Sequence, residues 1–115
     1  FLENRCVDYY QTGNCIFVHG GIRAHCEPEQ EDPDRLYWIS LGLATRHLSN
    51  RLVICGHTSQ LSGQIADLGH TICIDTAIAK DGKLTCLKVD DFSFIQSDTE
   101  GVITHGALPP NPDRP

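Results

Sequence analysis

The chain contains the stretch Cys15-Ile16-Phe17-Val18-His19-Gly20-Gly21. Its first four residues form an apolar run of β-branched and aromatic side chains, which predicts a buried strand. The two glycines after the histidine give the backbone freedom and predict a loop. A second stretch, Leu52-Val53-Ile54-Cys55-Gly56-His57, repeats this arrangement. Each predicted strand therefore ends in a glycine-flanked loop that carries a histidine.

The sequence around these two strands predicts an α+β fold. The acidic segment 25–34 contains two prolines and is expected to be a surface loop. Its last aspartates can cap a helix over residues 33–47, where leucine and isoleucine recur at helical spacing. Short apolar runs over residues 71–75, 84–89 and 92–95 predict three more strands, joined at the close spacing of a meander.

Composition limits the possible functions. The chain has 115 residues, 40% of them hydrophobic, and a net charge of −6. An acidic protein lacks the positively charged surface that attracts nucleic acid or an anionic membrane. In addition, no apolar run approaches the roughly 18 residues that span a bilayer. We therefore expect neither partner. Because the chain starts with Phe1 and contains no Met, we also expect either that a leader was removed or that the sequence is a fragment.

Six cysteines are present, at positions 6, 15, 26, 55, 73 and 86. Four of them, Cys15, Cys55, Cys73 and Cys86, lie inside apolar runs, where a free thiol behaves as a small buried hydrophobe. We therefore expect reduced thiols in a cytoplasmic protein. A disulfide-rich extracellular domain is the alternative, and it would require oxidised cysteines.

His19 and His57 are the candidate metal ligands. Strand ends of an α/β sheet place side chains in an open crevice, and neutral imidazole is a common ligand of Zn, Mn and Fe. The alternative is that both are ordinary polar residues at strand ends. Arg23 lies two residues after the Gly-Gly pair and can approach a substrate phosphate, or it can pair with Glu27 or Glu29.

Other polar and aromatic side chains are given structural roles. His25, His47 and His105 are expected to be solvated, and His70 to be structural. Asp75 is expected to accept hydrogen bonds from backbone donors of the next loop. Trp38 is expected to anchor its helix in the core rather than to form a platform for base stacking.

Several motifs together resemble a known family. Ile16-Phe17-Val18-His19-Gly20-Gly21-Ile22 resembles the fourth motif of the calcineurin-like metallophosphoesterases, and Val53 to Gln60 resembles their closing Gly-His-Thr motif. The branch is that of the Ser/Thr protein phosphatases and diadenosine tetraphosphatases. The segment 29–39 resembles the family's acidic loop and the Leu-Trp-Ile start of the helix that follows it. The family's closing strands are similar to segments 62–76 and 82–87. The resemblance covers roughly residues 1–97.

The resemblance implies the C-terminal part of an α/β/β/α sandwich with two divalent metal ions, of which Mn, Fe or Zn are expected. His19 and His57 would both bind the second ion. The earlier Asp-x-His, Gly-Asp-x-x-Asp and Gly-Asn-His motifs of the family do not occur in the sequence. Residues 1–104 would thus be the end of a longer phosphoesterase domain, and residues 105–115 a disordered proline-rich tail.

A chain without those motifs is expected to be inactive alone, whereas its parent would hydrolyse a phosphorylated protein or a nucleotide by metal-activated water. The alternative is a non-catalytic remnant or interaction module that retains the sheet.

Overall fold

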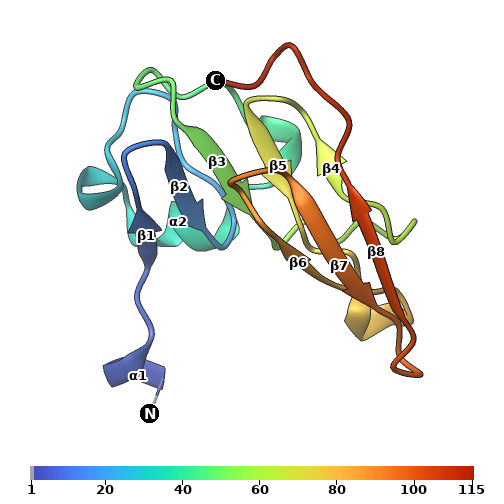
Figure 1. Ribbon diagram of the computed structural model, residues 1–115. Coiled ribbons are helices and arrows are strands. Elements are labelled where there is room, and N and C mark those ends of the chain that lie inside the picture. Colours follow the sequence, from blue (N-terminus) through green and yellow to red (C-terminus); the bar gives the residue numbers. More distant parts are fainter. Residues whose placement is uncertain (1) are drawn as a thin grey trace.

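Strands β2 (Cys15–Val18) and β3 (Leu52–Cys55) lie side by side and parallel at the centre of a five-stranded sheet (Figure 1). The computed structural model describes residues 2–115. Strand β5 (Thr71–Cys73) pairs in parallel with the other edge of β3. All four residues of β3 are buried, as expected for an apolar run in the middle of a parallel sheet.

Two short antiparallel strands, which the sequence did not indicate, complete this sheet. Strand β1 (Tyr9–Gln11) pairs with β2, and β4 (Ala66–Asp67) pairs with β5, so that the order is β1-β2-β3-β5-β4. Both strands are too short to show a clear alternation of polar and apolar residues.

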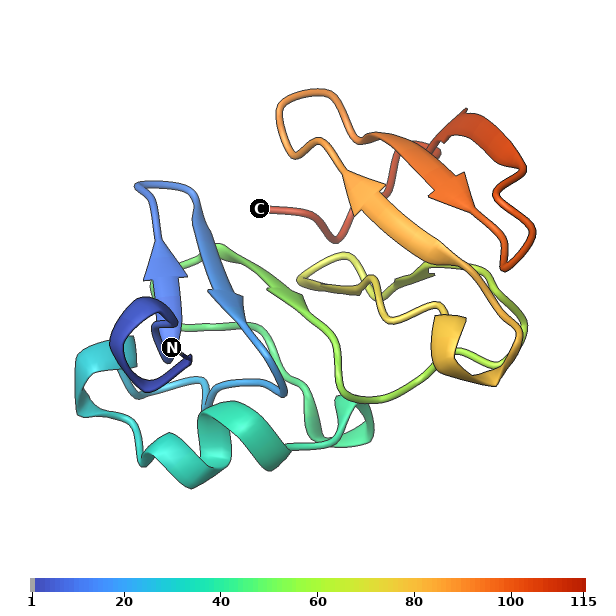
Figure 2. The same cartoon turned by 90° about the horizontal axis from the view of Figure 1, so that it is seen from below.

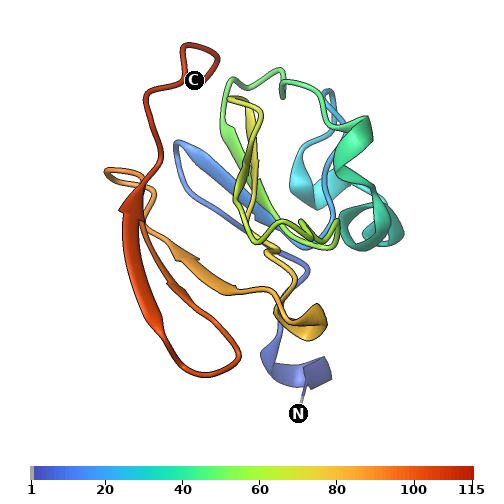
Figure 3. The ribbon, with the colours of Figure 1, turned by 90° about the vertical axis from the view of Figure 1, so that its right-hand side faces the viewer.

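The second sheet is an antiparallel meander of β6 (Leu84–Leu87), β7 (Ser93–Ser97) and β8 (Ile103–Ala107). The sequence predicts residues 71–75 and 84–89 in one meander, but β5 and β6 belong to different sheets. Figure 2 and Figure 3 show three layers, in which the helical segments of residues 28–43 cover one face of the first sheet and the second sheet covers the other. Residues 2–115 therefore form a small α+β fold with eight short strands in two sheets.

The first sheet separates two hydrophobic cores. One core contains Leu36 of the helical layer together with Ile16, Val53 and Cys73. The other contains Cys15, Leu52, Ile54 and Ile72, against which side chains of the second sheet and its connections pack. This alternation follows from the period of two along a strand, which sends successive side chains to opposite faces.

The helical segments are shorter than the sequence predicts. They are α1 (Leu2–Arg5), α2 (Pro33–Trp38) and the three-residue 3-10 helices η1 (Pro28–Gln30), η2 (Leu41–Leu43) and η3 (Ile78–Lys80). Asp32 caps α2 as expected, by accepting from the backbone N–H of Asp34. The helix predicted over residues 33–47 is wrong beyond Trp38, because Ile39 is extended and Ser40 caps a separate 3-10 turn. Leu43 therefore points into solvent and is 74% exposed.

The C-terminal segment also differs from the prediction of a disordered tail over residues 105–115. Residues 105–107 belong to β8. Beyond them, the Arg114 guanidinium donates to the carboxylate of Asp67 at 2.6 Å and lies 4.1 Å from the centroid of the Phe92 ring. Leu108 packs against the second core. These contacts join distant parts of the chain, so local composition does not reveal them.

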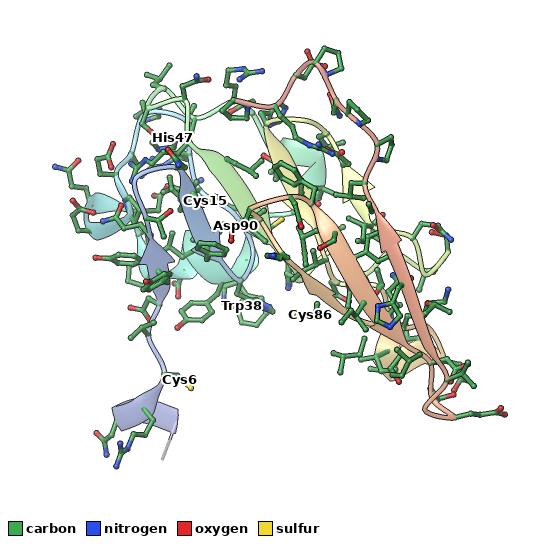
Figure 4. The ribbon with its side chains drawn as sticks, viewed as in Figure 1. Cys6, Cys15, Trp38, His47, Cys86 and Asp90 are labelled. Atoms are coloured by element: carbon green, nitrogen blue, oxygen red, sulfur yellow. The ribbon has the colours of Figure 1, made fainter. Side chains whose placement is uncertain are left out.

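All six cysteines are free thiols, and Cys15, Cys55 and Cys73 are buried as predicted. Cys86 is exposed, which corrects the prediction (Figure 4). In β6 the buried residue is Thr85, whose hydroxyl accepts from the Gln96 side-chain amide at 2.9 Å. The alternation along the strand then turns Cys86 outward. Over the described residues, no helix has the length and apolar character needed to cross a membrane.

Candidate functional site

The structure brings His19 and His57 together at the carboxyl ends of β2 and β3. Their ring centroids are 5.2 Å apart. The backbone N–H of Gly56 donates to the carbonyl oxygen of His19 at 2.7 Å, which ties the two loops to each other. Parallel strands end at the same edge of a sheet, and this is why two segments 38 positions apart deliver their histidines to one place. The predicted convergence of the two imidazoles is confirmed.

The ring separation fits two ligands of one metal ion. A metal held about 2.1 Å from an imidazole nitrogen lies about 3.2 Å from the ring centroid, so two rings at a tetrahedral angle have centroids about 5.2 Å apart. The observed separation is 5.2 Å. Both rings reach solvent, since His19 is exposed and His57 is half-buried. Within residues 2–115, no cluster of three or more His, Cys, Asp or Glu side chains is placed to hold a metal ion.

His57 has a strained backbone. Its φ is +63°, in the left-handed region that a residue with a side chain rarely adopts. Hydrogen bonds on both sides hold this conformation: the buried Cys73 thiol donates to the carbonyl oxygens of Gly56 and Thr58 at 3.5 and 3.4 Å. The Thr58 hydroxyl accepts from the backbone N–H of Leu41 at 2.9 Å. Strain of this kind occurs at functional sites, and Asn50, Ala77, Asp81 and Phe92 of this chain also have a positive φ.

Cys73 has a second buried partner in Cys55, which is its neighbour in register across β3 and β5. The hydrogen bond between the two thiols, together with burial, raises the pKa of Cys55. Cys55 therefore stays protonated beneath the loop that carries His57.

Helix α2 forms one wall of the site because its C-terminal end lies against the loop after β2. The backbone N–H of Gly20 donates to the carbonyl oxygen of Leu36 at 2.6 Å. A Cβ on Gly20 would lie 2.6 Å from the carbonyl oxygen of Tyr37, so only glycine fits this close approach. The contact places Tyr37 and Trp38 beside the histidines.

The two aromatic side chains of this wall each face one imidazole. The Tyr37 ring lies 6.3 Å from that of His19, and the Trp38 ring lies 5.4 Å from that of His57 at an angle of 80°. The Tyr37 hydroxyl donates to the carboxylate of Asp8 at 2.5 Å, and this hydrogen bond raises the pKa of Tyr37. The sequence favours a core anchor over a stacking platform for Trp38, and nothing in it indicates a place at the site for Tyr37, because nothing local pairs Gly20 with Tyr37.

Trp38 is not the core anchor that the sequence predicts. It is 67% exposed, and Figure 4 places it below the carboxyl ends of β2 and β3. The helix is anchored instead by Leu36, which is 1% exposed. Trp38 is the last residue of α2, and its indole lies outside the core in which Leu36 is buried.

Arg23 is engaged with a different carboxylate from those that the sequence suggests. Its guanidinium donates to Glu31 in a two-pronged contact with distances of 2.8 and 3.0 Å, and its backbone N–H also donates to Glu31. Neither Glu27 nor Glu29 pairs with it in the described residues, because Glu27 pairs with Arg51 and Glu29 accepts from Gln11. Arg23 therefore holds the loop after Gly21 to the start of α2.

Of the remaining histidines, His47 corrects the prediction. It is 2% exposed, and its Nε2 donates to the carbonyl oxygen of Cys26 at 2.8 Å while its Nδ1 bonds Ser49. His25 and His105 are exposed, as predicted. His70 lies at the amino end of β5, at the edge opposite the site, and bonds Thr71.

Asp75 accepts from the backbone N–H of Ala77 at 3.2 Å, as predicted, and from the Ser59 hydroxyl at the same distance. The hydrogen bond from Ser59 thereby attaches the loop 56–60 to the residues that follow β5.

No protein-family model matches this chain, and a search of curated proteins finds no significant match.

Proposed function

We propose that this chain is the C-terminal part of a calcineurin-like metallophosphoesterase, which hydrolyses phosphate esters by metal-activated water. The observation that carries the proposal is the pair of imidazoles at the ends of adjacent parallel strands, with centroids 5.2 Å apart. The sequence motifs around both histidines, and the layer order of helix, sheet and sheet, agree with it.

His19 and His57 would bind one of two divalent ions through neutral imidazole nitrogens. A pair of such ions lowers the pKa of bound water and holds the attacking and leaving oxygens of a phosphate ester. Two imidazoles make up about half of a four-ligand shell. The resemblance assigns the remaining ligands, including a bridging aspartate, to motifs that precede residues 1–104 in a complete domain. The 115-residue chain is therefore expected to be inactive alone.

The proposed substrate is a phosphorylated protein or a nucleotide, with no nucleic-acid or membrane partner. Arg23 does not enter this proposal as a phosphate ligand, because Glu31 already engages its guanidinium. The proposed compartment is the cytoplasm, which keeps thiols reduced. It is supported by the burial of Cys15, Cys55 and Cys73 as free thiols.

The test begins with the coding sequence upstream of Phe1. We expect it to encode Asp-x-His, Gly-Asp-x-x-Asp and Gly-Asn-His motifs. The product of the whole reading frame should then hydrolyse an aryl phosphate in the presence of Mn²⁺. His57→Ala should lower its kcat severely and reduce the metal content, whereas the matched variant His105→Ala, at an exposed position of β8, should change neither.

A reading frame that starts directly before Phe1 would contradict the proposal and favour a non-catalytic module. Turnover by the 115-residue chain itself, abolished by His57→Ala, would contradict the need for the other ligands.

A further inference from the structure

Trp38 is the only tryptophan of the chain and one of its most exposed apolar side chains, at 67%. Its position is nevertheless defined. The backbone N–H of the next residue, Ile39, donates to the carbonyl oxygen of Arg35 at 3.1 Å and closes the helix. The close contact between Gly20 and the Tyr37 carbonyl fixes the same turn against the sheet. An indole that is already held in place loses little conformational freedom when a ligand binds to it.

The indole lies beside a candidate metal ligand and is largely open to solvent. It meets the His57 ring at 80° in an edge contact, so the two rings do not cover each other by stacking. The indole also lines an open groove of about 510 Å³, together with Asp34, Arg35, Ile39 and Leu43. Leu43, 74% exposed, extends the apolar surface of this groove.

The distances place this surface within reach of a bound phosphate. A metal on His57 lies about 3.2 Å from the centroid of that ring, and the indole centroid lies 5.4 Å from the same point. The metal and the indole centroid would therefore be at most about 8.6 Å apart, so a phosphate on the metal would have Trp38 in its neighbourhood. Aromatic side chains bind planar rings by stacking, which is tolerant of the identity of the ring.

We propose that Trp38 is a stacking platform for an aromatic ring in the leaving group of the phosphate ester, which makes it a residue that determines specificity. The inference rests on the proposed metal site of His19 and His57. It selects, among phosphate esters, those of a nucleoside or a phenol over those of an aliphatic alcohol such as a serine side chain.

The test uses the 115-residue chain loaded with Zn²⁺ and the intrinsic fluorescence of Trp38, which has no other tryptophan to obscure it. Two matched pairs of ligands are titrated: adenosine monophosphate against ribose 5-phosphate, and phenyl phosphate against cyclohexyl phosphate. The aromatic member of a pair should quench the fluorescence and bind about 5- to 150-fold more tightly, the range that stacking supplies. The two pairs distinguish a nucleobase from a phenol ring.

Variants distinguish stacking on Trp38 from nonspecific binding to exposed apolar side chains. With binding followed by calorimetry, Trp38→Ala should remove the difference within each pair, and Trp38→Phe should keep part of it. Ile103→Ala, which removes an exposed apolar side chain from β8, should change nothing. Zn²⁺ binding with equal affinities within both pairs overturns the inference and leaves the metal site standing. Failure of Zn²⁺ to bind overturns the joint binding of one ion by His19 and His57, and with it the inference, whereas the coding sequence upstream of Phe1 tests the proposed function separately.

Discussion

Gly20→Ala tests whether the loop after β2 and the end of α2 are locked together. A methyl group at this position would lie 2.6 Å from the carbonyl oxygen of Tyr37, 2.7 Å from its carbon and 3.0 Å from the nitrogen of Ile39. All three atoms belong to the backbone, so no side chain can turn away to relieve the contact. The helix end or the loop has to move.

The expected cost has two parts. Overpacking of a close contact costs about 1–3 kcal/mol. The hydrogen bond from the Gly20 N–H to the carbonyl of Leu36 would be stretched as well, which costs about 1 kcal/mol. We therefore expect Gly20→Ala to lower the free energy of unfolding by about 2–4 kcal/mol.

Urea unfolding followed by circular dichroism measures this loss, and Trp38 fluorescence in the native state reports whether the helix end has moved. Gly13→Ala is the matched control. A Cβ on Gly13 meets no atom within 4 Å. Equal stabilities of the two variants, within about 0.5 kcal/mol, would refute the close packing of Gly20 on α2.

Three further predictions concern stability. His57→Gly should raise the free energy of unfolding by about 1 kcal/mol, since glycine adopts a positive φ without strain, while it removes the imidazole; a loss of stability in urea unfolding would contradict the presence of that strain. Burial alone would raise the pKa of Glu31, but hydrogen bonds from Arg23 and the backbone outweigh it and lower the pKa below the ordinary 4.5. The ionised carboxylate thus stabilises the fold above pH 4.5, and this stability should be lost as the pH falls through the lowered pKa. When urea midpoints are measured over a series of pH values, Glu31→Gln should reduce the fall of the midpoint in this acidic range. An unchanged fall would contradict the stabilising role of the Glu31 carboxylate. Arg114→Ala should cost about 1.5–3 kcal/mol by removing the charged hydrogen bond to Asp67, which keeps its bonds to Gly69 and Asn111, and an unchanged Tm would show that the C-terminal segment does not dock.

The parts of the fold that rest on local pattern could be predicted from the sequence. The apolar runs that became β2, β3 and β5 are continuous because those strands are buried, and their glycine-flanked ends place His19 and His57 at one sheet edge. That edge follows from the parallel pairing of β2 and β3. The convergence of the two histidines could thus be predicted from the sequence alone.

The parts that could not be predicted depend on contacts between distant segments. Leu43 has the spacing of a helical core residue, yet the chain leaves the helix after Trp38 and exposes it. His47 lies among polar residues in the sequence, but the carbonyl of Cys26, 21 positions away, binds it in the interior. Asp67 and Arg114, paired across 47 positions, are a third case.

The exposed position of Trp38 is the part of the candidate site that could not be predicted from the sequence. Tryptophan at helical spacing is more often part of a core, and composition gives no reason to expect otherwise. Its place beside His57 results from the approach of α2 to Gly20, which is a tertiary contact.

The central claim is that His19 and His57 bind one metal ion together. The direct measurement is a Zn²⁺ titration of the 115-residue chain labelled with ¹⁵N-histidine, followed through the ring nitrogens by NMR. The ring signals of His19 and His57 should shift together and saturate at one ion per chain, while those of the exposed His25 and His105 stay in place. Independent shifts of the two rings, or equal shifts of all exposed histidines, would contradict it.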